Sequence, residues 1–340
     1  SYSVSLIRNT LAIGAPGEDS NQTTITTSAS SNNSNSASGA VYVYEKTGTS
    51  WAMQAFIKAA NNDASDQFGS SVAINGETIA AGAPEEDSNQ TTITNGTSAS
   101  SNDSSAASGA VYVYKRTGTS WNQEAYIKSD NMTAGDNFGH VLAIYGDTLA
   151  VGAIGEDSNQ TSITNGINAS SNNSNTDSGA VYIYKRSGAT WAQEAYIKAV
   201  NNGASDNFGY SLSLNGETLA VGVYKEDSNQ TSITNGTSAS SDNSNADSGA
   251  VYIYKRSGTS WSQEAYIKAA NNRASDNFGY SVSLHADSLA VGAPGEDSNH
   301  TPITNGTSAS YDDSNSASGA FYIYKRSGTT WAQEAYIKAV

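Results

Sequence analysis

Residues 179–198 read GAVYIYKRSGATWAQEAYIK, two runs of strand-forming residues that flank the pair Ser187-Gly188. Val, Ile, Tyr and Trp favour β-strands, and a glycine between two such runs is typical of a hairpin. Nearly the same stretch occurs five times, which indicates one supersecondary unit stacked on copies of itself. The tryptophan of each copy marks an interval of 70 residues: Trp51, Trp121, Trp191, Trp261 and Trp331.

Each copy carries two more apolar runs ahead of this hairpin, and no copy has an apolar stripe with helical spacing. The pair Asn75-Gly76 separates these two runs in the second copy and suits a two-residue type I′ hairpin. We therefore predict an antiparallel meander of four strands per copy. In the third copy the predicted strands cover residues 138–144, 148–153, 179–185 and 190–199.

The third predicted strand has apolar or aromatic residues on both faces, with Ala180 and the tyrosines on one and Val181 and Ile183 on the other. A strand of this kind is covered on both sides. The fourth predicted strand alternates less cleanly, because Trp191, Gln193, Ala195 and Ile197 would share one face and Ala192, Glu194, Tyr196 and Lys198 the other. A mixed face suits the outermost strand of a sheet.

Small sheets that are covered on both faces and repeated along the chain are typical of a β-propeller, whose closure also protects strand edges. The sequence predicts an all-β fold, a five-bladed β-propeller that forms a single domain over residues 1–340. The predicted blades are residues 1–60, 61–130, 131–200, 201–270 and 271–340.

The first copy differs from the others in a loop and at its start. It has Thr26-Thr27 where the second copy has Thr94-Asn95-Gly96-Thr97, which is a deletion of two residues. It also begins inside a repeat, so we expect that a leader or a further region precedes it. We expect the ring to close by side-chain packing, because an open array would need dissimilar capping repeats.

Composition excludes several classes of function. The formal net charge is −15 and 14% of the 340 residues are charged, so the basic stripe that phosphate binding needs is absent and nucleic acid is not expected as a partner. The chain contains no run of about 18 apolar residues, so membrane insertion is not expected. Cysteine is absent, which excludes disulfides, thiolate zinc sites and cysteine nucleophiles.

A family resemblance is carried by three motifs in a fixed order. Phe68-Gly69 is followed by Gly82-Ala83-Pro84 and then by residues 109–114, GAVYVY, and this order recurs along the chain. The pattern resembles the FG-GAP repeat, the blade unit of the integrin α-subunit head and of many bacterial and algal extracellular proteins. The resemblance implies an extracellular or cell-surface location and a role in adhesion or matrix contacts.

In many members of that family, calcium is bound in an Asp-x-Asp-x-Asp-Gly loop between the first two strands of a blade. Here that position holds tight turns such as Asn75-Gly76-Glu77 and Tyr145-Gly146-Asp147. One carboxylate in a short turn cannot supply the six to eight oxygen ligands that calcium takes. The integrin-type metal site is therefore not expected in this chain.

A different acidic segment, Glu-Asp-Ser-Asn, follows the second predicted strand of every copy. Two carboxylates and an amide oxygen are hard ligands that suit calcium, whereas Asp and Asn also form turns that fold a loop back on itself. Both interpretations stay open at this point, and no organic cofactor is expected. The candidate metal ligands are Glu18, Asp19, Asn21, Glu86, Asp87, Asn89, Glu156, Asp157, Asn159, Glu226, Asp227, Asn229, Glu296, Asp297 and Asn299.

A second recurring acid lies two residues before each Phe-Gly, in the connection between blades. It could cap a turn or bind a metal from an adjacent loop, and we expect the capping role. These residues are Asp66, Asp136, Asp206 and Asp276.

The acidic segment opens a loop of roughly 25 residues that consists almost entirely of Ser, Thr, Asn, Gly and Asp. A loop of this length in a compact domain is usually functional or disordered. We expect the loops to form a polar crown on one face of the ring. They also contain Asn-x-Ser/Thr triplets, and the glycosylation candidates are Asn21, Asn89, Asn95, Asn159, Asn229, Asn235, Asn299 and Asn305.

The sequence gives little support for catalysis. His140, His285 and His300 occupy different places in their repeats, and no nucleophile elbow or phosphate-binding loop is present. We predict a non-catalytic extracellular module for structure or adhesion, which calcium could stabilise. The expected partners are extracellular protein, matrix or glycan, and the module could self-assemble into a larger array. The alternative is a lectin-like multivalent binder that uses the rings of Trp191, Tyr196 and their equivalents, one carbohydrate site per blade.

Overall fold

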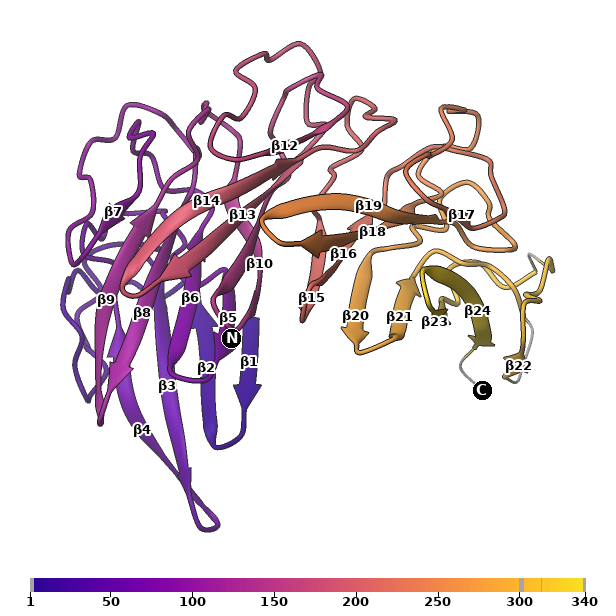
Figure 1. Cartoon of the computed structure of the whole chain (residues 1–340). Helices are drawn as coiled ribbons and strands as arrows, with labels where there is room; N and C mark the ends of the chain where they lie inside the picture. The colour runs from indigo at the N-terminus through magenta and orange to yellow at the C-terminus, as the bar shows by residue number, and fades with distance from the viewer. Residues whose placement is uncertain (1–2, 300–302, 313, 339–340) are drawn as a thin grey trace. The chain divides into compact units, whose positions relative to one another are not determined.

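The computed structural model describes residues 3–299, 303–312 and 314–338. Regular secondary structure in these residues is β-strand (Figure 1), and none of them forms a helix long and apolar enough to cross a membrane. The strands form five antiparallel sheets, one for each sequence repeat. The chain divides into two compact units, Ser1–Glu156 with Gly166–Ser171 and Tyr182–Tyr196, and Asp157–Asn165 with Asn172–Val181 and Ile197–Val340.

The first two sheets lie in the first unit. The first sheet has the order β1-β2-β3-β4, and the second adds a short fifth strand to give β5-β6-β8-β9-β7. The strands are β1 (Ser3–Ile7), β2 (Thr10–Ala15), β3 (Ala40–Thr47), β4 (Ser50–Ile57), β5 (Ser71–Asn75), β6 (Thr78–Ala83), β7 (Thr94–Asn95), β8 (Ala110–Thr117) and β9 (Ser120–Ile127).

The third sheet has the order β10-β11-β13-β14-β12. Its four long strands agree within two residues with those predicted from the sequence, because strand-forming residues and turn glycines mark both ends of each. The strands are β10 (Phe138–Tyr145), β11 (Thr148–Ala153), β12 (Ile163–Asn165), β13 (Ala180–Ser187) and β14 (Thr190–Ile197).

The fourth and fifth sheets lie in the second unit and repeat the same order, β15-β16-β18-β19-β17 and β20-β21-β23-β24-β22. The five sheets are the blades of a five-bladed β-propeller fold, as predicted, and closure of the ring stays a prediction. The strands are β15 (Ser211–Asn215), β16 (Thr218–Val223), β17 (Thr234–Asn235), β18 (Ala250–Ser257), β19 (Ser260–Ile267), β20 (Ser281–His285), β21 (Ser288–Ala293), β22 (Thr304–Asn305), β23 (Ala320–Ser327) and β24 (Thr330–Ile337).

The short fifth strand was not predicted. In the second blade Thr94 and Asn95 of the long loop pair with Tyr126 and Ala125 on the outer strand. Two residues are too few to show any hydrophobic period, so the sequence pattern gives no indication of this pairing. The first blade keeps only a single bridge, between Thr26 and Phe56, because the Asn-Gly pair is deleted there.

The turn between the first two strands differs in detail from the prediction. In the second blade Asn75 pairs with Thr78, so the loop residues are Gly76 and Glu77. Gly76 has φ of 57°, whereas Glu77 has no positive φ. A type I′ turn requires positive φ at both positions, so the turn is of another type.

Burial confirms that the third strand is covered on both faces, because Ala180 to Tyr184 are all buried. The outer strand contains a β-bulge that was not predicted. In the fourth blade Ile253 pairs with Ala265 but Tyr254 pairs with Gln263, which leaves Glu264 as the extra residue. The same bulge interrupts β4, β9 and β24, and the simple alternation predicted for the outer strand is therefore wrong there.

Close backbone crossings explain the Phe-Gly and Gly-Ala motifs. A Cβ atom on Gly109 would lie 2.2 Å from the carbonyl oxygen of Phe138, and one on Gly82 would lie 2.1 Å from that of Gly139. Only glycine allows the connection into the third blade to cross the second blade at this distance. The Phe138 ring then packs edge-on against Tyr182, with 5.3 Å between ring centroids.

Candidate functional site

The glutamate of the acidic segment lies in the interior of its blade. In the second blade Glu86 is 1% exposed. Its Oε2 accepts hydrogen bonds from Lys128 Nζ at 2.7 Å and from the Ser88 backbone N–H at 3.1 Å. Its Oε1 accepts from the Tyr126 hydroxyl at 2.7 Å and from Asn61 Nδ2 at 3.0 Å. Four protein donors thus occupy the four lone-pair positions of this carboxylate.

This arrangement, which we call the glutamate hub, connects two blades because Asn61 belongs to the connection that leaves the first. Asn61 Oδ1 in turn accepts a hydrogen bond from the Tyr112 hydroxyl. Burial lowers the pKa of Lys128 against the opposing effect of Glu86. Burial, followed by the charge of Glu86, raises the pKa of Tyr112 well above its usual value. The hub therefore places a lysine and a carboxylate in contact in a poorly solvated interior.

Most of the hub recurs in the later blades. Glu226 accepts from Lys268, Tyr266 and Asn201 at 2.7, 2.8 and 2.9 Å. The first blade has a reduced version, because Phe56 replaces the tyrosine; among the described residues the Glu18 carboxylate accepts hydrogen bonds from Lys58 and Ser20. Further hub contacts are those of Glu156 with Asn131 and Tyr196, and of Glu296 with Lys338, Tyr336 and Asn271.

The aspartate of the acidic segment fastens the two ends of the long loop together. Asp87 Oδ1 accepts a hydrogen bond from the backbone N–H of Ala107 at 2.8 Å, and Ala107 has the left-handed φ of 51°. The loop is thereby folded back on itself, as one of the two sequence interpretations proposed. The corresponding pairs are Asp19 with Ala37, Asp157 with Asp177, Asp227 with Asp247, and Asp297 with Ala317.

The asparagine of the segment faces solvent in every blade, at Asn21, Asn89, Asn159, Asn229 and Asn299. The glutamate, aspartate and asparagine thus point in three directions and do not converge. In the described part of the chain, no three His, Asp or Glu side chains form a group that could hold a metal ion. Calcium binding and glycosylation at these segments stay predictions.

A second asparagine, on the short fifth strand, joins neighbouring blades. Asn95 Oδ1 accepts the backbone N–H of Trp191 at 2.8 Å, and Asn95 Nδ2 donates to the Trp191 carbonyl at 3.3 Å. We call this pair of bonds the amide clasp. A glycan on Asn95 would replace a hydrogen of the nitrogen that makes this bond. The same clasp joins Asn165 to Trp261 and Asn235 to Trp331.

The sequence analysis missed the amide clasp, although the deletion in the first copy falls on the same Asn-Gly pair. It also missed the role of the bulged glutamate. Glu124 accepts two hydrogen bonds from Arg186, at 2.8 and 2.6 Å, and one from Trp191 Nε1 at 3.0 Å. Bidentate pairs of this kind fix geometry as well as contributing energy.

Most of the aromatic rings on which the lectin alternative depended are buried, whereas Trp51 in the first blade is 43% exposed. Trp121, Trp191, Trp261 and Trp331 are at most 3% exposed, and the rings of Tyr126, Tyr196, Tyr266 and Tyr336 are fully buried. A sugar-stacking platform needs an exposed ring in each blade. These positions instead pack between and within blades.

The recurring aspartate before Phe-Gly caps a turn, as predicted. Asp66 accepts the backbone N–H of Asp63 at 3.2 Å, and Asp206 accepts that of Gly203 at 3.0 Å. Burial, followed by the charge of Glu86, raises the pKa of Asp66 to about 8. Burial raises the pKa of Asp206 to about 7. The equivalent bonds are from Thr133 to Asp136 and from Arg273 to Asp276.

The histidines do not share a structural position. His140 lies in β10, where burial lowers its pKa, and His285 is exposed at the end of β20. His300 lies outside the described residues.

The sequence profile of the FG-GAP repeat matches residues 51–114, 121–184, 191–254 and 261–307. The chain belongs to the FG-GAP repeat family. Each complete match begins at the tryptophan of one blade and ends in the third strand of the next, so the repeat of the family includes the Phe-Gly crossing between two blades. A search of curated proteins finds no match to the chain.

Proposed function

We propose that this FG-GAP chain is a non-catalytic structural or adhesion module of the extracellular space. In this proposal its long polar loops contact protein, matrix or glycan. One observation carries the proposal: the lysine and the glutamate of a fully formed hub are buried and paired with each other, whereas the long loops are exposed. Glu86 and Lys128, for example, are each 1% exposed.

The loops are exposed yet shaped by their own side chains. In the second blade both the backbone N–H and the hydroxyl of Ser104 donate to Asn102 Oδ1, at 3.1 and 2.6 Å. Ser174 with Asn172 and Ser244 with Asp242 repeat this motif. Such local bonds give a loop a preferred conformation without a hydrophobic core. A pre-shaped polar loop loses less conformational entropy on binding than a flexible one, which favours recognition.

Adhesion can be tested with the chain coupled to latex beads in a flow cell coated with collagen, alginate or mucin. The matched variant replaces residues 101–104 and 171–174 by Gly-Ser linkers of equal length, which keeps the Ser100 and Ser170 carbonyls that Asn61 and Asn131 of the hubs contact. We expect the native beads to be retained on at least one coating at a shear that removes the variant beads. Equal retention of both on all three coatings would contradict a role of the loops.

Calcium binding is the second part of the proposal, and it concerns the solvent-side oxygens of Asp87, Asn89 and their equivalents. The test is thermal unfolding in millimolar calcium and in excess chelator, because a ligand that binds the folded chain raises its Tm. A higher Tm in calcium that is lost in an Asp87→Asn, Asp157→Asn double variant would support the site. Identical unfolding curves in calcium and in chelator would mean that the acidic segments only hold the ends of the long loops together.

A further inference from the structure

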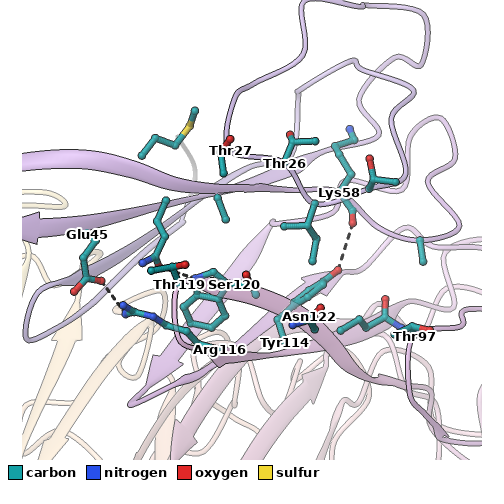
Figure 2. Close-up of a pocket in the computed structure, with 18 of the residues that line it drawn as sticks. Thr26, Thr27, Glu45, Lys58, Thr97, Tyr114, Arg116, Thr119, Ser120 and Asn122 are labelled. Carbon is teal, nitrogen blue, oxygen red and sulfur yellow. Dashed lines mark hydrogen bonds and ion pairs between the residues drawn. The ribbon is translucent and has the colours of Figure 1, made fainter.

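A large cleft opens between the first and second blades (Figure 2). Its volume is about 970 Å³, and its walls include Thr26 and Gln54 of the first blade and Arg116 and Trp121 of the second. All of these residues belong to the first compact unit. The cleft lies where the first blade lacks its fifth strand.

The equivalent space between the fourth and fifth blades is divided into two smaller cavities. One, of about 270 Å³, contains Trp331, the equivalent of Trp121, and the other, of about 390 Å³, contains Glu264, the equivalent of Gln54. Asn235 lines both cavities and therefore separates them. Deletion of the Asn-Gly pair from the first blade removes this partition and joins the two spaces.

The deletion also leaves hydrogen-bonding groups of the cleft without their usual partners. At the other described junctions an asparagine clasps the tryptophan backbone, but no side chain among the described residues does so for Trp121. In the second blade the carbonyl of the bulged residue, Glu124, accepts a hydrogen bond from the Gly96 N–H at 2.6 Å. The equivalent carbonyl in the first blade is that of Gln54, and the equivalent glycine is deleted there. Met53 replaces Gln123, whose side-chain amide holds the loop in the second blade.

We propose that this cleft binds an extended peptide segment that presents an asparagine side chain to the backbone of Trp121. The bound asparagine repeats the amide clasp that Asn95 makes with Trp191, and the residue after it donates its N–H to the Gln54 carbonyl. The ligand class is thus an Asn-Gly-containing polypeptide, supplied by another protein.

The walls of the cleft favour an uncharged peptide. Arg116 is paired with Glu45 at 2.9 Å and Lys58 with Glu18 at 2.7 Å, and the uncharged Gln54 accepts a hydrogen bond from Trp121 Nε1 at 2.8 Å. The charges of the cleft are therefore already neutralised within the protein. The remaining wall is rich in threonine, from Thr23 to Thr27, and suits Ser, Thr and Asn side chains.

The test uses a synthetic peptide with the sequence of residues 92–98, TITNGTS, which forms the partition in the second blade. We expect measurable binding to the intact chain by isothermal titration calorimetry. The same peptide with Asn95→Leu should bind at least about tenfold more weakly, because it loses two hydrogen bonds. Hydrogen exchange of residues 119–123 should slow with the native peptide only.

The matched protein variant carries Asn-Gly inserted between Thr26 and Thr27, which rebuilds the partition in the chain itself. We expect this variant to fold and to lose peptide binding, because its own asparagine occupies the Trp121 backbone. No binding at millimolar peptide, equal binding of the Asn95→Leu peptide, or unchanged binding to the insertion variant would each overturn the proposal.

Discussion

The junction between the first and second blades differs from that between the second and third at its outer edge. Both junctions have a Phe-Gly connection that crosses glycines of the preceding blade, at Gly39 and at Gly109. Both are also followed by a blade with a buried glutamate hub. The outer edge of the second junction has the amide clasp and the Glu124 pair with Arg186, whereas the first junction has neither.

This difference separates two layers of interaction. The crossings and hubs are buried, so a change there leaves atoms in collision or a charge without a partner. The outer edge is reached by solvent, so Arg116 can exchange a partner on the bulge for Glu45. The inner layer, which consists of the crossings and the hubs, therefore holds each blade against the next. The outer layer can vary between junctions and can form a cleft.

The largest effect is expected where the inner layer is fully formed. Lys128→Met removes the cation from Glu86 and leaves a buried carboxylate unpaired, which should lower the free energy of unfolding by about 3–5 kcal/mol. Lys58→Met should cost less, because the Glu18 side chain is 12% exposed and can be solvated. Chemical denaturation of both variants gives the comparison. An equal decrease in the free energy of unfolding in the two variants would show that the hubs of the first and second blades contribute equally to stability.

The crossing glycines come next. Gly109→Ala places a methyl group 2.2 Å from the Phe138 carbonyl at φ of +81°, and should cost about 3 kcal/mol from collision and strain. Gly118→Ala is the matched control, because its φ is +63° but nothing lies within 4 Å. The control should cost about 1 kcal/mol. A similar loss in the two variants would assign the cost to backbone conformation alone.

Conversion of one junction into the other should have a smaller effect. Asn95→Leu removes the amide clasp from the second junction and should lower the free energy of unfolding by about 1–2 kcal/mol. Insertion of Asn-Gly between Thr26 and Thr27 should raise it by about 1 kcal/mol. The two changes are compared by thermal unfolding. A stabilised Asn95→Leu variant would contradict the role of the clasp.

The last comparison concerns the turn caps, whose effect on the free energy of unfolding depends on pH. The pKa of Asp66 is raised to about 8 in the folded chain, so its contribution is fully present below pH 4 and is lost as the pH rises through 8. Asp66→Asn, which stays neutral, should flatten this decline in Tm. Asp206→Asn should flatten a decline that ends near pH 7. Parallel profiles for the native chain and both variants would show that neither carboxyl takes up a proton on folding.

Much of the fold follows from the sequence alone. The runs at Gly179 to Lys185 and Thr190 to Ala199 form strands because their side chains fit a pleated, buried surface. The regular interval between tryptophans shows that the chain has five repeats, and each repeat forms one sheet. The turn-capping role of Asp66 was also predictable, since a lone acid before a tight crossing has few other partners. These properties depend on neighbours in the chain.

The roles within the acidic segment were decided only by the tertiary structure. The sequence places Glu86, Asp87 and Asn89 side by side as a set of oxygen ligands. The fold points Glu86 at Lys128, which lies 42 positions further along, and points Asp87 at Ala107. The asparagine that joins two blades, Asn95, meets Trp191 across 96 positions. Local sequence determines which residues form a strand. The partner of a buried carboxylate, by contrast, is the donor that packing of the sheets places beside it, and that packing depends on contacts between distant segments.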